Sequence, residues 1–131
     1  MKLAINLPLL VFYQALAEAY VLCRHLNLDN TWLMEFLSDT SGGANVLKNR
    51  GPMIAMPLDG KDPGAANFDI DLIRKDLATM VAEAKSRGAT LPLAEKTLAI
   101  YDEAARDGWG SRDGAWLPAY WPQRNSGEKR S

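Results

Sequence analysis

Residues 2–26, KLAINLPLLVFYQALAEAYVLCRHL, form the stretch that decides the fold. The stretch is apolar on every face of a helix but is dotted with polar side chains, a pattern typical of a buried central helix in an all-α domain. It is long enough to span a bilayer. Glu18, however, would be costly in lipid as an ionised group, and no small-residue cleavage site of a signal peptide follows. We therefore expect a cytoplasmic protein that makes no contact with a membrane.

The head of this stretch breaks two local rules of helix formation. Lys2 lies in the first turn, where the positive end of the helix dipole repels a cation by about 0.3–1 kcal/mol. Asn6, one turn later, competes for backbone hydrogen bonds and is a weak helix former. Side chains four residues apart share a helix face, and broken local rules concentrate at functional sites. Lys2 and Asn6 are therefore candidate functional residues, and the structural alternative is a solvated lysine beside a tolerated asparagine.

Helical spacing continues along the rest of the chain, with almost no strand signal. The predicted helices run over about 2–26, from the Asp29 cap to Leu37, around 45–50, from Asp69 to Arg87, from 91 to 108, and from Ser111 to Tyr120. The apolar face of the second helix is predicted to consist of Trp32, Leu33, Phe36 and Leu37. Gly51-Pro52 is expected to stop the third helix, and Gly88 to cap the fourth. The result is an all-α, multi-helix domain around the long N-terminal helix.

Length and charge narrow the class of protein. The chain of 131 residues predicts one domain with a core of its own. We place the helical domain at residues 1–121 and expect 122–131, which are polar and basic, to be a disordered tail. The formal net charge of −1, with acids and bases interspersed, argues against binding to nucleic acid. Cys23 is expected to be a buried thiol, and with His25 two residues away it makes no metal site, so no metal is expected.

Nucleotide-binding fingerprints are missing from the sequence. There is no strand followed by G-x-G-x-x-G and no P-loop, and the glycines at 42–43 and 108–110 lie in loops without a preceding strand. His25 lies in helical apolar sequence, so no Ser-His-Asp arrangement is readable. The chain thus carries no cofactor-binding motif of its own.

The chain contains a series of short motifs. Each motif alone is weak, but their order and spacing together are specific enough to indicate a family. The series consists of KLAIN at 2–6, ALAEA at 15–19, LSDTSG at 37–42, Phe68, Leu72, KDL at 75–77, Gly88, LPL at 91–93, Tyr101, Gly108, Gly110 and Asp113. Over residues 2–121 it resembles the C-terminal helical domain of the β-hydroxyacid dehydrogenases. That family includes 3-hydroxyisobutyrate dehydrogenase, tartronate semialdehyde reductase and the glyoxylate/succinic semialdehyde reductases. The resemblance implies an all-α fold like the C-terminal domain of the more distant 6-phosphogluconate dehydrogenase.

The resemblance implies roles for particular residues. Lys2 matches the catalytic lysine that exchanges the proton of the substrate hydroxyl, and Asn6 matches the asparagine that orients the substrate. Lys75 matches a lysine near the nicotinamide end of the cofactor, while Phe68 and Asp76 match positions that line the same pocket. A free lysine has a pKa of about 10.4, so acid–base work near neutral pH requires burial or a nearby cation. Lys75 would be that cation.

The resemblance also implies an enzyme of two domains. Family members are oxidoreductases that act on small 3-hydroxyacids or semialdehydes with NAD or NADP, and the cofactor is bound mainly by an N-terminal Rossmann domain. This sequence begins just before the catalytic lysine and does not include that domain. We therefore expect the isolated chain to fold, to be inactive alone, and to form a homodimer or a higher homo-oligomer through its first helix and the neighbours of that helix.

Other interpretations of the same residues stay open. Imine reductases share the architecture but usually lack the catalytic lysine, and a stand-alone dimerisation module would keep the fold without the chemistry. Phe68 also fits a hydrophobic staple at a helix start, and Asp71 with Lys75 fits an ordinary i,i+4 ion pair. The chain departs from the family in having a single asparagine, Asn6, where relatives often have two. It also has Pro8, which is expected to bend the first helix.

Overall fold

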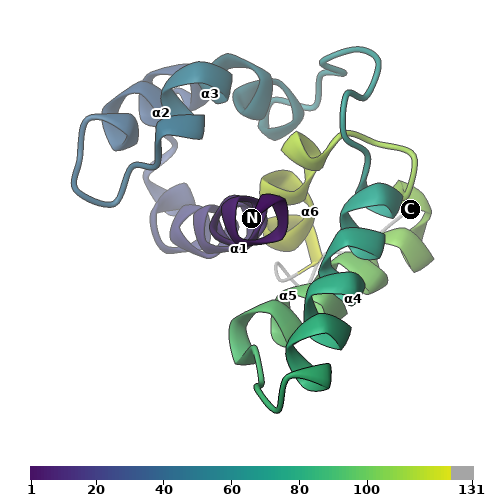
Figure 1. Cartoon of the computed structure of the whole chain (residues 1–131). Helices are drawn as coiled ribbons and strands as arrows, with labels where there is room; N and C mark the ends of the chain where they lie inside the picture. The colour runs from purple at the N-terminus through teal and green to yellow at the C-terminus, as the bar shows by residue number, and fades with distance from the viewer. Residues whose placement is uncertain (125–131) are drawn as a thin grey trace. The chain divides into compact units, whose positions relative to one another are not determined.

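The computed structural model describes residues 1–124, and this part of the chain is helical (Figure 1). The α-helices are α1 (Lys2–Cys23), α2 (Asn30–Ser38), α3 (Asn45–Leu58), α4 (Ile70–Ser86), α5 (Pro92–Ala104) and α6 (Leu117–Arg124). Shorter helical turns are η1 (Arg24–Leu26), η2 (Ala105–Trp109) and η3 (Gly114–Trp116). Within residues 1–124, extended pairing is limited to one isolated bridge between Asp69 and Asp113. The all-α prediction is confirmed.

The described helices fall into two compact units, each assembled from two stretches of the chain. Unit 1 consists of Met1–Gln14 and Ala65–Gly114, and it holds the start of α1 together with α4, α5 and η2. Unit 2 consists of Ala15–Gly64 and the residues from Ala115 on, and it holds the end of α1 with α2, α3 and α6. The helix α1 therefore contributes residues to both units.

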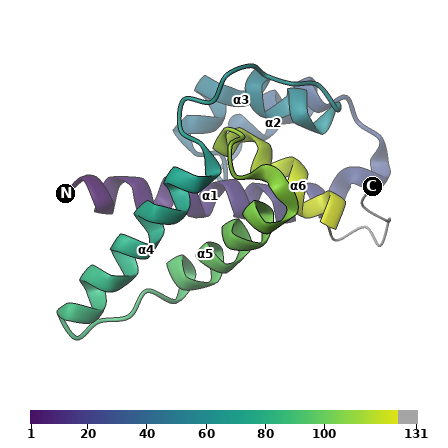
Figure 2. The same ribbon diagram turned by 90° about the vertical axis from the view of Figure 1, so that its right-hand side faces the viewer.

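In unit 1, α4 and α5 lie side by side and are joined by a short turn (Figure 2). α4 is capped by Asp69, whose Oδ1 accepts the N–H of Leu72 at 2.8 Å. After its last residue the chain turns at Gly88, where φ is 76°, a conformation that glycine adopts at no steric cost. α5 begins at Pro92, which occupies the first helical turn. The boundaries at Asp69 and Gly88 confirm the predictions made from the sequence, and α5 begins one residue after the predicted start at 91.

A buried tyrosine joins α5 to α1 inside unit 1. The Tyr101 hydroxyl donates to the carbonyl of Leu10 at 3.0 Å. Burial raises the pKa of Tyr101 well above its ordinary value, and the neighbouring Tyr13 and Asp113 raise it further. The hydroxyl therefore stays protonated and keeps donating well beyond neutral pH. Around it lies the apolar core of the unit: Ile70, Ile73, Leu77, Met80, Ala94 and Ala104.

In unit 2, α2 packs against α3, and α6 contacts α3 as well. α2 begins at the predicted cap, where Oδ2 of Asp29 accepts the N–H of Trp32 at 2.9 Å. Its inward side chains are Leu33 and Met34, which are 4% and 1% exposed. Burying side chains of this size contributes about 1.5–3 kcal/mol each, so the α2–α3 contact is a main source of stability in this unit.

The course of α3 contradicts the prediction that Gly51-Pro52 stops a short helix, because the helix continues beyond them to Leu58. Pro52 and Pro57 both lie inside it, and each lacks the N–H that would bond one turn back. Buried side chains on both sides of the break hold the helix together: Leu47, Ile54 and Ala55. Tertiary packing therefore overrides the local breakers, as it commonly overrides propensity.

The apolar face predicted for α2 is also wrong in part. Trp32 and Phe36 are 48% and 52% exposed, and their rings stack with centroids 5.1 Å apart. Met34 takes the inward position that the prediction gave to the aromatic rings. The two rings cover each other's faces, which lowers the cost of leaving them at the surface.

Several expectations near the chain ends also differ from the structure. The last helix, α6, begins at Leu117 rather than at Ser111, because η3 precedes it. Residues 122–124 belong to α6, with Pro122 buried, so helical structure extends past the predicted boundary at 121. The rest of the predicted tail, 125–131, lies outside the described residues. Cys23 is partly exposed rather than buried, since it is the last residue of α1.

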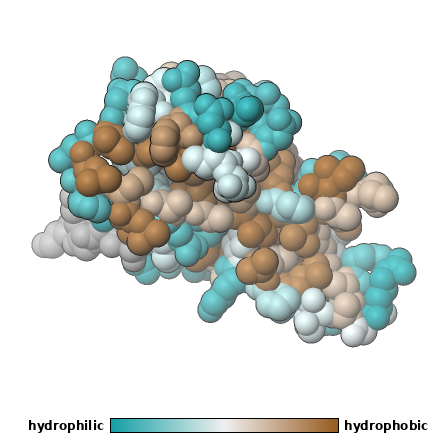
Figure 3. All heavy atoms as spheres, turned by 90° about the vertical axis from the view of Figure 1, so that its left-hand side faces the viewer, coloured by the Kyte–Doolittle hydropathy of each residue, from teal (hydrophilic) through white to brown (hydrophobic). Residues whose placement is uncertain are grey.

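The long N-terminal helix combines a buried middle with exposed apolar ends. Lys2–Leu26 is long and apolar enough to cross a membrane, a test that core helices of soluble proteins and signal sequences also pass. Ile5 and Leu22 are 65% and 79% exposed, and Figure 3 shows apolar side chains at the surface of the face that it draws. The buried side chains in the middle of the helix include Leu10, Tyr13, Leu16 and Ala17.

Candidate active site

Lys2 and Asn6 lie one turn apart at the start of α1, in unit 1. Their spacing places them on one face of the helix. The Lys2 side chain is exposed and that of Asn6 is half-buried. Pro8 follows, and because it has no N–H it leaves the carbonyl of Ala4 without its usual helical donor. This end of α1 thus presents an ammonium group and an amide in the same direction.

Phe68 is held where the connection 59–69 meets α4. Its N–H donates to Oδ2 of Asp113 at 3.3 Å, and its carbonyl accepts the N–H of Gly114 at 3.0 Å. The same Asp113 oxygen accepts the N–H of Asn67 at 2.9 Å. The backbone of Phe68 is therefore bonded on both sides, and its half-buried ring projects from a defined position. The alternative of a staple at the helix start also fits this position, two residues before α4.

Lys75 and Asp76 follow one another on α4, with Lys75 exposed and Asp76 half-buried. The ion pair between Asp71 and Lys75, kept as an alternative above, is absent. Asp71 Oδ1 instead lies 2.9 Å from Nη1 of Arg74, whose Nε is 2.7 Å from Oδ1 of Asp102. Hydrogen bonds to Asp102 and then to Asp71 raise the pKa of Arg74. A guanidinium fork can hold two carboxylates at once, which a single ammonium does less well.

The polar side chains predicted for the site have no partners of their own. Within residues 1–124, no hydrogen bond or ion pair involves the side chain of Lys2, Asn6, Lys75 or Asp76. All of them, with Phe68, belong to unit 1, although the two on α1 and the three at α4 are not bonded to each other. A lysine without a carboxylate partner is available to an anionic ligand, so unit 1 holds the candidate site.

Asp113 is the residue whose role sequence reasoning missed, since it entered only as one member of the motif series. Its side chain is 1% exposed, and a carboxylate that deep requires hydrogen bonds. Its one signal in the sequence is a charge between two glycines, Gly110 and Gly114. Gly114 lies close against a buried side chain, and Gly110 lies close against an exposed one. A Cβ at Gly114 would lie 2.6 Å from Cδ1 of Ile73, and one at Gly110 would lie 2.6 Å from the Asp71 carboxylate.

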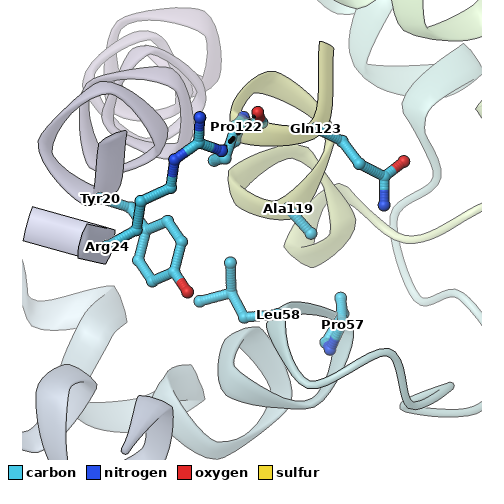
Figure 4. A pocket seen from close by; sticks show the side chains of 7 residues that line it. All are labelled: Tyr20, Arg24, Pro57, Leu58, Ala119, Pro122 and Gln123. Atoms are coloured by element: carbon cyan, nitrogen blue, oxygen red, sulfur yellow. Dashed lines mark hydrogen bonds between the residues drawn. The ribbon is translucent and has the colours of Figure 1, made fainter. Parts of the chain in front are cut away.

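A separate hollow lies in unit 2 (Figure 4), lined by Tyr20, Arg24, Pro57, Leu58, Ala119, Pro122 and Gln123. Its polar groups are bonded within the protein: Arg24 Nη1 donates to the carbonyl of Pro122 at 2.7 Å, and the Tyr20 hydroxyl donates to Asn30 Oδ1 at 3.0 Å. Its volume is about 180 Å³, below the roughly 300–1,000 Å³ of typical small-molecule sites. None of the predicted site residues lines it, so it is not the candidate active site.

Sequence comparison finds a family that matches almost the whole described chain. Residues 1–120 match the family described as NAD-binding of NADP-dependent 3-hydroxyisobutyrate dehydrogenase. The uncharacterized oxidoreductase YfjR of Bacillus subtilis (strain 168) is 30% identical over 116 residues. The aligned part is 88% of this chain and 39% of YfjR.

Two solved structures are similar to the chain. The 3-hydroxyisobutyrate dehydrogenase ygbJ of Salmonella typhimurium superposes with a TM-score of 0.73 at 24% identity, over 91% of this chain and 40% of that protein. This match shows the fold alone. The 3-hydroxyisobutyrate dehydrogenase of Mycobacterium tuberculosis, solved with L-serine, gives a TM-score of 0.73 at 25% identity, over 91% and 41% of the two chains. The chain thus spans about two-fifths of the length of these relatives.

Proposed function

The chain belongs to the NADP-dependent 3-hydroxyisobutyrate dehydrogenase family, and we propose that it is the helical domain that gives such an enzyme its acid–base lysine and its dimer surface. The observation that carries the proposal is the match over residues 1–120, which includes every polar residue of the candidate site. Those residues are left without protein partners within residues 1–124. Lys2 and Lys75 are therefore available to an anionic substrate and cofactor.

The substrate class is a small 3-hydroxyacid or the matching semialdehyde. The M. tuberculosis relative was solved with L-serine, which carries a carboxylate and a hydroxyl on adjacent carbons of a short chain. Nζ of Lys2 and the amide of Asn6, on one helix face, can hydrogen-bond to such a molecule at both groups. Asn6 supplies the amide that orients the substrate, and Phe68 and Asp76 line the pocket.

Lys2 carries the proton in the proposed reaction. In the oxidation direction, the neutral amine of Lys2 takes the hydroxyl proton of the substrate at Nζ and becomes an ammonium, while the hydrogen on the same carbon leaves with its electron pair as hydride and the alcohol becomes a carbonyl. A bound nicotinamide cofactor supplies the hydride acceptor. Lys75 adds a second positive charge near the reacting end of the cofactor. In the reverse direction Lys2 returns the proton to the new alkoxide oxygen.

This chemistry needs more surface than residues 1–124 provide. A lysine works as a base near neutral pH when water is kept away from it and a like charge stands nearby, but Lys2 is exposed here. The described residues contain no strand and therefore no Rossmann sheet. We propose that a dinucleotide-binding domain covers Lys2 in the working enzyme, and that this chain alone does not turn over substrate.

We also propose that a second copy of the chain binds unit 2. Between residues 22 and 36 the unit exposes five large apolar side chains, here called the 22–36 surface: Leu22, Leu26, Leu28, Trp32 and Phe36. Their exposed fractions run from 39% for Leu28 to 79% for Leu22. Exposed apolar patches rimmed by polar residues commonly mark protein interfaces, and stacked aromatic rings are frequent anchors in them.

The test compares the 131-residue chain with the same chain joined to a dinucleotide-binding domain of the family, using 3-hydroxyisobutyrate and L-serine with NAD⁺ and NADP⁺. We expect reduced cofactor to appear with the joined protein alone. Turnover by the isolated chain would refute the need for a covering domain. Oxidation of cyclic amines in place of hydroxyacids would favour an imine reductase, and inactivity of a folded, joined protein on both classes would favour a dimerisation module.

A further inference from the structure

We propose that Asp113 is a positioning residue for Phe68: its buried carboxylate sets the backbone from which the Phe68 ring enters the substrate pocket. The inference deepens the function proposed above and rests on it for the role of Phe68. Neither the sequence motifs nor the comparisons assign a role to Asp113.

One carboxylate oxygen of Asp113 accepts two backbone hydrogen bonds. Oδ2 of Asp113 accepts the N–H of Asn67 at 2.9 Å and that of Phe68 at 3.3 Å. On the other side of the same residue, the Phe68 carbonyl accepts the N–H of Gly114, the next residue after the aspartate, at 3.0 Å. Two consecutive residues, 113 and 114, therefore hold both polar groups of the Phe68 backbone, although they lie more than 40 positions away.

Asp113 lies in residues 110–114, here called the strap, and the strap is hydrogen-bonded to the start of α4. The N–H of Ile70 donates to the carbonyl of Arg112 at 2.9 Å, and the N–H of Asp71 donates to that of Gly110 at 2.9 Å. The strap 110–114 can lie this close because its ends are glycines, as the 2.6 Å approach of a Cβ at Gly114 to Ile73 shows. The position of Phe68 is thus tied to the first turn of α4, the helix that also carries Lys75 and Asp76.

The fold of this region does not by itself explain why residue 113 is an aspartate. The N-terminus of α4 already has its cap in Asp69, and the strap already has three backbone hydrogen bonds to residues 68–71. A charged group that is 1% exposed is costly to bury, so an apolar residue would serve packing better. What the carboxylate adds is a fixed direction for the N–H groups of Asn67 and Phe68, directly before the proposed pocket.

The experiment uses the full chain with its three phenylalanines replaced by 4-fluorophenylalanine, so that ¹⁹F NMR reports on Phe12, Phe36 and Phe68. Asp113→Ala removes the acceptor, and Asp113→Asn keeps one oxygen for the two N–H groups. Tyr101→Phe is the control, because it removes a buried hydrogen bond of the same unit without touching residues 67–68. Each variant is titrated with 3-hydroxyisobutyrate, and amide exchange is followed at Phe68.

We expect Asp113→Ala to move or broaden the Phe68 signal, to speed exchange of its N–H by about tenfold, as loss of one hydrogen bond predicts, and to weaken the response of Phe68 to ligand. Asp113→Asn should recover part of each effect, and Tyr101→Phe should leave Phe68 unchanged at comparable loss of stability.

Unchanged Phe68 signals in Asp113→Ala, or equal changes in Tyr101→Phe, would overturn the proposal. So would failure of both Asp113 variants to fold, which would assign the residue to folding alone. If the unsubstituted chain shows no response to ligand even when it is joined to a dinucleotide-binding domain, the proposed function fails, while the signal and exchange of Phe68 still decide the role of Asp113.

Discussion

At Lys2 an exposed ammonium stands at the start of α1 without an ion-pair partner in residues 1–124. If it transfers the substrate proton, Lys2→Ala in the protein joined to a dinucleotide-binding domain should lower kcat by about 10²–10⁴-fold, the usual share of a general acid or base. The helical circular dichroism should not change, because the side chain supports no contact of the fold. Lys85→Ala, an exposed lysine in the last turn of α4, is the control and should keep full activity. Equal losses in both variants, or activity in Lys2→Ala, would contradict the assignment.

At Tyr101 a single hydroxyl links stability to pH. Tyr101→Phe should lower the free energy of unfolding by about 1 kcal/mol at pH 7, because a buried hydrogen bond to Leu10 is lost. The pKa of Tyr101 is raised in the folded state, so below about pH 10 both states are protonated, and above it the unfolded chain ionises first. The native tyrosine then loses stability as pH rises, whereas phenylalanine does not. Urea titrations at pH 7 and 10.5 should show the gap between the two proteins narrowing, and a constant gap would refute the link.

At the scale of the element, the loop between α2 and α3 contains two adjacent glycines with opposite surroundings. A Cβ at Gly43 would lie 2.5 Å from the carbonyl oxygen of Leu37 and 2.9 Å from Cα of Ser38, whereas one at Gly42 would meet nothing within 4 Å. Backbone atoms cannot move aside easily, so Gly43→Ala should destabilise the protein by about 1–3 kcal/mol. Gly42→Ala should be neutral or stabilise slightly by restricting the unfolded chain. Thermal unfolding of the two variants checks this, and similar midpoints would show that the loop relaxes around Gly43.

Pro52 interrupts the hydrogen bonds of α3 from an exposed position. Pro52→Ala should restore the N–H that bonds to the carbonyl of Lys48 and stabilise the protein by about 1–3 kcal/mol, the range that follows from the cost of proline inside a helix. Pro92→Ala is the matched control, because Pro92 lies in the first turn of α5, where no intrahelical N–H bond is lost. Denaturant unfolding measures both. Loss of stability in Pro52→Ala would mean that the proline ring itself makes a contact that α3 needs.

The elements show which parts of the structure a sequence can predict. Asp29, Asp69 and Gly88 were predictable as helix boundaries because a cap acts on residues three or four positions away. The continuation of α3 past Gly51-Pro52 was not, because it depends on packing against α2. The same limit applies to the candidate site. Lys2, Asn6, Lys75 and Asp76 lie on the predicted helices, but the hydrogen bonds that Asp113 accepts from Asn67 and Phe68 link distant positions, and their only sign in the sequence is a charge between two glycines.

At the scale of the whole molecule, we interpret two sets of exposed side chains within residues 1–124 as binding surfaces. In unit 1, Lys2 and Lys75 are exposed, which suits anionic ligands, and the apolar side chains of Ile5, Leu72 and Leu93 are exposed as well. In unit 2 the uncovered groups are the apolar side chains of the 22–36 surface, which suits a protein partner. The candidate ligand site and the 22–36 surface consist of different residues in different units, so we expect a substitution at one surface to leave the function of the other intact.

Self-association is the property that tests this division. Leu22 is 79% exposed in unit 2 and Leu93 is 66% exposed in unit 1, so the two leucines form a matched pair. If a second copy covers the 22–36 surface, Leu22→Glu should convert a dimer to a monomer, because a buried unpaired carboxylate costs several kcal/mol. Leu93→Glu should leave the dimer unchanged. Light scattering at tens of micromolar reads the mass of each protein, with circular dichroism to show that each is folded. A monomeric native chain would exclude the dimer, and equal dissociation by both leucine substitutions would mean that the interface is not confined to the 22–36 surface.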